Sequence, residues 1–436
     1  MGAVRSRERL GGASHTCPVS VHLARADGAA GANRNVSVLA PGLGLGAWEE
    51  APRWCGAASG LSWALLPVGL VGHTATVEET TTKPIPPSPT GQRRMHLVGT
   101  LPQFDEPGAA LSWQLNDLQG QVRRLSGGET GERAIWIVPV VQRLAREPVV
   151  RRVRSGGWTR YDDVDRFAVR RGRRLEPRHL DLRVAQYGAE ELRVLSDLGH
   201  PATEDTPLQV GVPGNFDMAL FSFGPVAALR LAPVFRRRLG QDIAALIAQA
   251  GPAVVFQLEM PVELVAVAAA PGPVQPVAAR VVARSVLRQV AEAPAGARFG
   301  VHLCLGDLGH RALRQLPDTA PLVHLTNALV RGWPRGRRLD FVHLPMSGGN
   351  RPPPLDPGFY APLHGLRETM PVETELIAGL AHEEQTLTDQ IQVLQLVEDT
   401  LDRTVDVATS CGLGRRLPLE ADAAVRRTLE LLQPTS

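Results

Sequence analysis

The sequence predicts an α/β protein whose residues 95–436 form a (β/α)8 barrel, the TIM barrel. Short apolar runs rich in β-branched residues recur along this segment, and amphipathic patterns such as residues 231–250 and 383–402 lie between them. Such runs are typical of buried parallel strands joined by crossover helices. Eight runs in a segment of this length suit a barrel with insertions. A doubly wound open sheet is the alternative, but no Gly-rich dinucleotide fingerprint follows any run.

The predicted strands are spread over the whole of this segment. In chain order they are MHLVGTLP at residue 95, IWIVPVV at 135, PLQVGVPG at 207, PAVVFQLEMP at 252, ARFGVHLCLG at 297, LDFVHLP at 339, ETELIAGLA at 373 and TVDVATSCG at 404. In a (β/α)8 barrel the carboxyl ends of all strands meet at one mouth, where the chemistry takes place. Residues at those ends are therefore the first candidates for a site.

Residues 1–94 lack the repeating pattern of the rest. They are rich in Gly, Ala, Pro and Thr, and they end in ETTTKPIPPSPTGQRR. Two interpretations are open: a disordered leader, or upstream sequence that is translated because the start is assigned too early. Met95, which is followed at once by the strand-like HLVGTLP, favours the second interpretation. Neither gives this segment a part in the chemistry.

Composition and charge argue against several classes of protein. Hydrophobic residues make up 44% and charged residues 21% of the chain, as in soluble globular proteins, and no apolar run approaches the ~20 residues that cross a bilayer. Residues 1–94 hold nine Lys and Arg against six Asp and Glu, so they carry the whole net charge of +3. The neutral remainder argues against a nucleic-acid partner. Cysteines at 17, 55, 304 and 411 form no disulfide scaffold in a chain this long, so we expect a reducing, cytoplasmic setting.

The stretch FGVHLCLGDLGH, residues 299–310, carries the most informative pair of side chains. His302 and Cys304 are two positions apart on a predicted strand, so both emerge on the same face. Imidazole and thiolate are ligands that suit zinc, whereas the simpler interpretation is a buried histidine beside a small buried cysteine. A barrel would bring Cys411, after the last strand, to the same mouth. Convergence of all three residues favours a metal site.

Two acidic residues are expected at the same mouth. Glu259 ends the strand in FQLEMP, and Glu129 lies in SGGETGER. An unpaired carboxylate at the end of an apolar strand costs free energy, which favours a site role for Glu259. Glu129 is either a site residue or a surface salt-bridge partner of Arg133.

Several motifs, taken in order, resemble those of the cobalamin-independent methionine synthase family, in its C-terminal catalytic barrel. HLCLG, with SCGLGRR 107 positions after its cysteine, is similar to the H-x-C…C zinc signature of that family. The motifs VGTLPQ, GGETGER, FQLEMP and YAPLHGL stand where the family has G-S-F-P-Q, G-E-x-x-R, Q-I-D-E-P and D-I-H-S elements. The same barrel superfamily contains uroporphyrinogen decarboxylase.

The resemblance implies a zinc site and a set of substrate residues. The implied zinc ligands are His302, Cys304 and Cys411. The implied substrate residues, which hold an amino-acid thiol chiefly through its amino group, are Thr100, Glu129 and Glu259. His364 matches a histidine implicated in proton transfer beside the methyl donor, and we take it with Glu259 as the catalytic pair.

The sequence departs from the family at two places that bear on the site. Where the family completes the zinc site with a glutamate, this chain has Pro345, which cannot be a ligand. His343, two residues earlier on the same face of that strand, is either the fourth ligand or a packed strand histidine. Met260 replaces the second acid of the Asp-Glu pair. These changes leave the identity of the thiol open.

The function that these residues predict is a zinc-dependent methyl or alkyl transfer onto a zinc-activated small-molecule thiol. The methyl donor would be a methylated folate, a methylated corrinoid protein or a small methylated metabolite. Two alternatives are a metal-free decarboxylase of the uroporphyrinogen decarboxylase type and a diverged, non-catalytic binding barrel. A metal-free decarboxylase would not explain why His302, Cys304 and Cys411 converge at one mouth.

Overall fold

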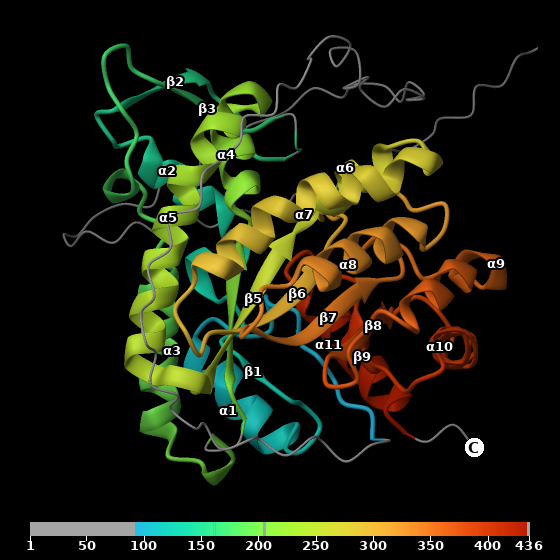
Figure 1. Ribbon diagram of the computed structural model, residues 1–436. Coiled ribbons are helices and arrows are strands. Elements are labelled where there is room, and N and C mark those ends of the chain that lie inside the picture. Colours follow the sequence, from blue (N-terminus) through green and yellow to red (C-terminus); the bar gives the residue numbers. More distant parts are fainter. Residues whose placement is uncertain (1–91, 160, 162, 204–205, 434–436) are drawn as a thin grey trace, which may run out of the picture. The chain divides into compact units, whose positions relative to one another are not determined.

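The computed structural model describes residues 92–159, 161, 163–203 and 206–433, which form an α/β structure around one parallel sheet (Figure 1). Most of the segment 1–94, for which a leader was predicted, lies outside the described residues. The sheet has seven strands in the described part, in the order β1-β4-β5-β6-β7-β8-β9, and every neighbouring pair is parallel. A second, two-stranded antiparallel sheet pairs β2 with β3.

The strands are short and carry mostly buried residues in the large sheet. Their bounds are β1 Leu125–Ser126, β2 Val150–Arg154, β3 Arg166–Val169, β4 Leu208–Pro213, β5 Val254–Met260, β6 Arg298–Leu303, β7 Arg338–Pro345, β8 Glu375–Ala381 and β9 Asp406–Thr409. All six strands predicted from residue 207 onward are confirmed, as β4 to β9.

Helices fill the crossovers between successive strands. The α-helices are α1 Pro107–Asp117, α2 Ile137–Leu144, α3 Val184–Leu198, α4 Asn215–Phe223, α5 Pro225–Ala250, α6 Pro261–Ala269, α7 Gln275–Glu292, α8 Ala320–Gly332, α9 Pro357–Tyr360, α10 Leu387–Leu401 and α11 Pro418–Leu431. Short 3₁₀ helices include η1 Gly131–Ile135 and η6 Ala361–Leu366. None of the helices in the described part is long and apolar enough to cross a membrane.

The strand predicted at residue 135 is wrong, because IWIVPVV forms the end of η1 and most of α2. Pro139 lies in the first turn of α2, where a missing N–H breaks no helical hydrogen bond. Val140, Val141 and Leu144 are buried at helical spacing on one face. A short apolar run is compatible with both periods, and packing decides between them.

The sheet is curled, and the segment that begins at Met95 links its two ends. Met95 forms isolated parallel bridges to Val407 on β9 and to Val122, just before β1. The backbone N–H of Leu101 donates to the carbonyl of Gly128 at 2.8 Å. The predicted first strand is thus reduced to single bridges, and the structure has a curled seven-stranded sheet where eight regular strands were expected. Complete closure of a barrel stays a prediction.

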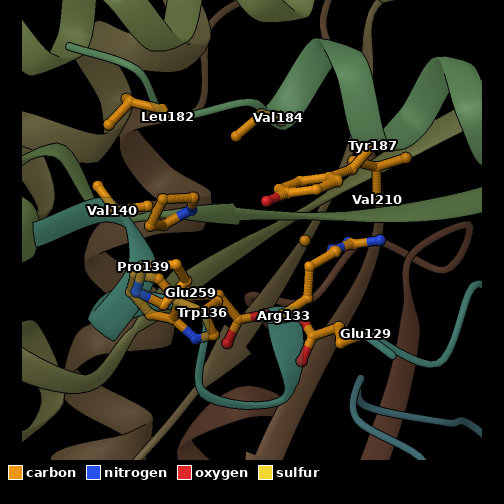
Figure 2. Close-up of a pocket in the computed structure, with 12 residues that line it drawn as sticks. Glu129, Arg133, Trp136, Pro139, Val140, Leu182, Val184, Tyr187, Val210 and Glu259 are labelled. Atoms are coloured by element: carbon orange, nitrogen blue, oxygen red, sulfur yellow. The ribbon is translucent and has the colours of Figure 1, made fainter. Parts of the chain in front are cut away.

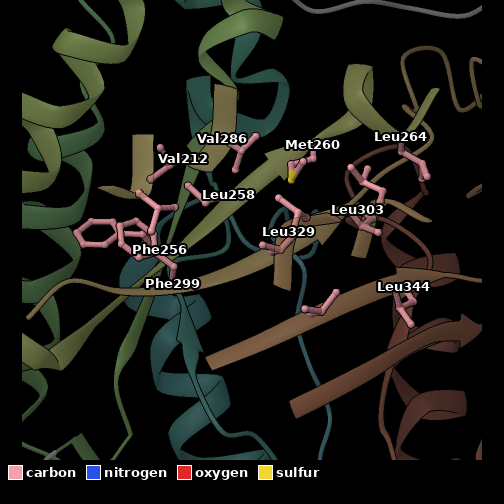
Figure 3. Packing of buried hydrophobic residues seen from close by; sticks show 14 of the residues in the cluster. Val212, Phe256, Leu258, Met260, Leu264, Val286, Phe299, Leu303, Leu329 and Leu344 are labelled. Atoms are coloured by element: carbon pink, nitrogen blue, oxygen red, sulfur yellow. The ribbon is translucent and has the colours of Figure 1, made fainter. Parts of the chain in front are cut away.

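Strand alternation sends apolar and polar side chains to opposite faces of the sheet. On β5, Phe256, Leu258 and Met260 pack into the main core, together with residues of the covering helices (Figure 3). Between them, Gln257 and Glu259 turn to the other side, where Gln257 Nε2 donates to the carboxylate of Glu259 at 2.7 Å. The period of two therefore lets one strand serve both the core and a polar interior.

Close packing inside the curled sheet gives a test of the fold. An ideal Cβ at Gly300 on β6 would overlap the buried ring of Phe341 on β7. We expect Gly300→Ala to lower the free energy of unfolding by about 1–3 kcal/mol or more, because the ring must move against its neighbours. Urea unfolding followed by circular dichroism measures the change.

The matched control for that substitution is Gly240→Ala in α5. Apart from the adjacent backbone of α5 itself, no described heavy atom lies within 4 Å of an ideal Cβ at Gly240, so alanine there should stabilise the helix by about 0.5–1 kcal/mol. Equal stability of Gly300→Ala and the parent protein would contradict the packing described for β6 and β7.

Candidate functional site

The candidate site lies at the carboxyl ends of β5, β6 and β7, where in-register pairing sets three polar side chains beside one another. Glu259 on β5 pairs with His302 on β6, and His302 pairs with His343 on β7. Alternate residues of a strand share a face, so the three side chains lie together while Leu258 and Leu303 join the main core. Residues distant in sequence thus become neighbours through strand register.

Next to this row, one histidine and two cysteines form a compact group of possible metal ligands. The ligand atoms of His302, Cys304 and Cys411 all lie within 4.8 Å of one another, and the two Sγ atoms are 3.6 Å apart. Cys304 directly follows β6, and Cys411 lies two residues after β9. No other group of three or more His, Cys, Asp and Glu side chains suited to a metal was found in the described part of the chain. The convergence expected from the sequence is therefore present.

A chain of hydrogen bonds links His302 to the backbone through His343. His343 Nε2 lies 3.0 Å from the carbonyl oxygen of Thr409, and in the tautomer that donates to this carbonyl, Nδ1 of His343 is an acceptor. In that tautomer His302 Nδ1, 2.8 Å from His343 Nδ1, is the donor. His302 Nε2 then has no proton, and its lone pair faces the site.

That nitrogen has no hydrogen-bond partner among the described residues, and Glu259 Oε2 lies 3.7 Å from it. His302 is fully buried, and its Nε2 makes no hydrogen bond to any described residue. A buried, unpaired acceptor costs free energy unless something else binds it. Burial and the nearby His343 hold the pKa of His302 well below its usual range, which keeps the ring neutral. One imidazole lone pair and two thiols are a donor set that zinc prefers, so these residues fit a bound zinc ion.

His343 lies behind the ligand group in a supporting position. Its ring nitrogens lie against His302 and the backbone of Thr409 and Leu303, and burial lowers its pKa to about 4. An ideal Cβ at Gly379 would be 2.6 Å from His343 Nε2, so the glycine provides room for the ring. The sequence left open whether His343 is a ligand or a packed strand histidine. In this geometry it orients His302, as a second residue often does for a metal-binding histidine.

The two thiols differ in exposure, since Cys304 is buried and Cys411 is partly exposed. Cys304 is buried, and the N–H of Gly306 points at its Sγ from 3.2 Å. The shared hydrogen bond with Cys304, together with burial, raises the pKa of the Cys411 thiol well above its usual value. His310 also reaches this corner, since an ideal Cβ at Gly349 would be 3.8 Å from the Cβ of Cys411 and 4.0 Å from Nε2 of His310. Nothing in the sequence predicted that His310 would lie here.

The three residues expected to hold substrate lie near one another. Thr100 Oγ1 donates to Glu129 Oε2 at 2.6 Å, and Glu259 Oε2 is 3.7 Å from His302 Nε2. Glu129 has a φ of 44°, an unusual value for a residue with a side chain and one often found at functional sites. Burial raises the pKa of both carboxyls, and the charge of Glu129 raises that of Glu259 further.

A pocket opens beside the two acids (Figure 2). It encloses about 510 Å³ of space, part of it open to solvent, and the two acids and Arg133 form one edge. Figure 2 shows Tyr187 and Val184 on one side of this space and Trp136 on the other. Sequence reasoning missed these walls because α2 was expected to be a strand and α3 carried no recognised motif.

His364 is not brought to this group. Its side chain is exposed on η6, and only its backbone carbonyl accepts a hydrogen bond from a described residue, the N–H of Arg367. The motif YAPLHGL was expected to form a turn at the mouth. Instead, Leu363 and Leu366 anchor η6 in the layer of helices beside α8 and α10. The catalytic role predicted for His364 has no geometric support.

The chain matches no protein-family model and no protein of curated function. Among solved structures, a methyltransferase from Methanosarcina mazei is similar over 78% of this chain and 95% of its own, with 13% sequence identity and a TM-score of 0.44. A likeness this distant carries no information on activity. The resemblance to the methionine synthase family therefore stays a prediction, and the function must come from the site itself.

The ligand group makes a direct prediction about metal content. We expect Cys304→Ser and Cys411→Ser each to lose most bound zinc while the protein stays folded, because a hydroxyl does not ionise at neutral pH as a thiol does on zinc. Elemental analysis of untagged protein measures the zinc, and circular dichroism checks the fold. His324→Ala, on the partly exposed α8, is the histidine control. Full zinc occupancy in either serine variant would refute the assignment.

The supporting role of His343 makes a separate prediction. In His343→Phe the ring volume is kept but His302 loses its hydrogen-bond acceptor, so we expect zinc affinity to fall about 10–100-fold. Competition with a chromophoric chelator measures this affinity. A loss as complete as that of Cys304→Ser would instead make His343 a ligand. Unchanged affinity would show that the hydrogen bond does not matter.

Proposed function

We propose that this protein is a zinc-dependent transferase that moves a methyl or other alkyl group onto a small-molecule thiol. The observation that carries the proposal is the unpaired Nε2 of His302, buried beside the thiols of Cys304 and Cys411. Zinc held by these three groups would leave a position for a substrate thiol and supply the positive charge that favours its thiolate form.

The protein's own residues would hold the acceptor beside that position. Glu129, fixed by the hydroxyl of Thr100, and Glu259, fixed by the amide of Gln257, present two carboxylates toward one space. They would bind a cationic amine of the substrate, which fixes the distance between this amine and the thiol. Such positioning makes a bimolecular reaction effectively unimolecular.

The proposal also covers the closure of the barrel, the cellular setting and the methyl donor. The residues from Met95 to Leu101 would complete a closed barrel as its eighth strand, and the cytoplasm would keep the thiols reduced. The donor would be a methylated folate, a methylated corrinoid protein or a small methylated metabolite. A metal-free decarboxylase or a non-catalytic barrel would leave His302 Nε2 buried without a partner, and no contact at the site favours either.

The experiment that tests the function combines metal analysis with a thiol-dependent transfer assay. We expect about one zinc per chain and methyl transfer from at least one donor class to an amine-bearing thiol. Transfer should fall at least about 100-fold in Cys304→Ser, with His324→Ala unchanged. Zinc-free folded protein, or zinc-loaded protein that transfers no methyl group with any of the three donor classes, would refute the proposal.

A further inference from the structure

The pocket beside the zinc ligands has two chemically different halves. The first half is the space between the two carboxylates. An ideal Cβ at Gly211 on β4 would lie 3.1 Å from Oε1 of Glu129 and 3.8 Å from Oε1 of Glu259. The glycine therefore leaves open the gap that separates the two acids, and a small cationic group would fit in this gap.

Acidic side chains dominate this half. The carboxyl groups of Glu129 and Glu259 face each other across the gap at Gly211. Arg133 is the cation at the edge of the pocket, but it forms an ion pair with the buried carboxylate of Glu191. This half of the pocket therefore favours a bound cation over a bound anion.

The second half is apolar and aromatic. Val140, Leu182 and Val184 are buried residues that contribute to its wall. Trp136, which lies between η1 and α2, and Tyr187 on α3 face the same space (Figure 2). Two contacts hold the Tyr187 ring in place. Its hydroxyl donates to Glu132, and the guanidinium carbon of Arg133 lies over the ring, 4.8 Å from the centroid. Apolar walls with a few placed polar groups are typical of pockets for ligands with an apolar body.

We propose that the acceptor carries an apolar, preferably aromatic, body in addition to its amine, and that the body binds between Trp136 and Tyr187. The presence of a thiol on this acceptor rests on the proposed function, whereas the binding of the amine and the body does not. A short, wholly polar amino-acid thiol would leave the apolar half of the pocket filled only with water, without gain from burial.

The first test measures binding without any chemistry. Calorimetry on the full chain compares 2-phenylethylamine with ethylamine, which lacks the ring, and with 3-phenylpropionate, which inverts the charge. We expect 2-phenylethylamine to bind at least about tenfold more tightly than either control compound. Equal affinity for 2-phenylethylamine and ethylamine, or tighter binding of 3-phenylpropionate, would overturn the proposal.

Three variants locate the binding. Val184→Phe should fill the apolar half and weaken 2-phenylethylamine about tenfold, with little effect on ethylamine. Glu129→Gln should weaken both amines. Val226→Phe, an equal change at an exposed position of α5, is the control and should leave all affinities unchanged. Unchanged affinity of 2-phenylethylamine in folded Val184→Phe would place its binding elsewhere and overturn the proposal.

A final comparison separates this inference from the proposed function. Zinc-free protein that still binds 2-phenylethylamine tightly would refute the transferase and support the pocket assignment. Conversely, a transferase that methylates cysteamine as fast as 2-amino-3-phenylpropane-1-thiol would refute the pocket assignment and support the transferase. With both proposals correct, kcat/KM should be at least about tenfold higher for the phenyl-bearing thiol.

Discussion

The hydrogen bond between the Nδ1 atoms of His302 and His343 is the interaction on which the rest of the site depends. When His302 donates from Nδ1 in this bond, its Nε2 is free to face the two thiols. The bond exists because β6 and β7 pair with these two histidines opposite each other. A shift of this pairing by two residues would keep the polar face but separate the rings, so strand register controls the chemistry.

Burial of these polar groups costs free energy, but it also strengthens the interactions between them. Four ionisable groups at the centre, His302, His343, Glu129 and Glu259, have pKa values shifted so that their neutral forms are favoured, because burial penalises their charged forms. In a dry interior, charges interact more strongly than in water. A bound metal and a bound amine would each offset part of this cost, because each supplies the partner that the protein groups lack.

Different parts of the fold supply the metal-ligand group and the walls of the pocket. The ends of β5, β6 and β9 present the ligand group and Glu259, and their positions are held by continuous strand pairing. The pocket walls come from α2, α3 and the loop before α3, which lie outside the sheet. This division allows the walls to differ between related proteins while the ligand group stays the same, and it is why substrate class must be argued from Trp136 and Tyr187 rather than from the sheet.

The sequence by itself determined the strands β4 to β9 and the shared face of His302 and Cys304, because a period of two is a local property that packing did not overturn. It also indicated that Cys411 would converge on them, since parallel strands end at one mouth. Tertiary packing decided what local pattern could not. IWIVPVV forms helical structure in η1 and α2, and His364 lies on η6 beside the helices α8 and α10. His343 lies within hydrogen-bond distance of His302 because pairing between separate strands places the two rings side by side.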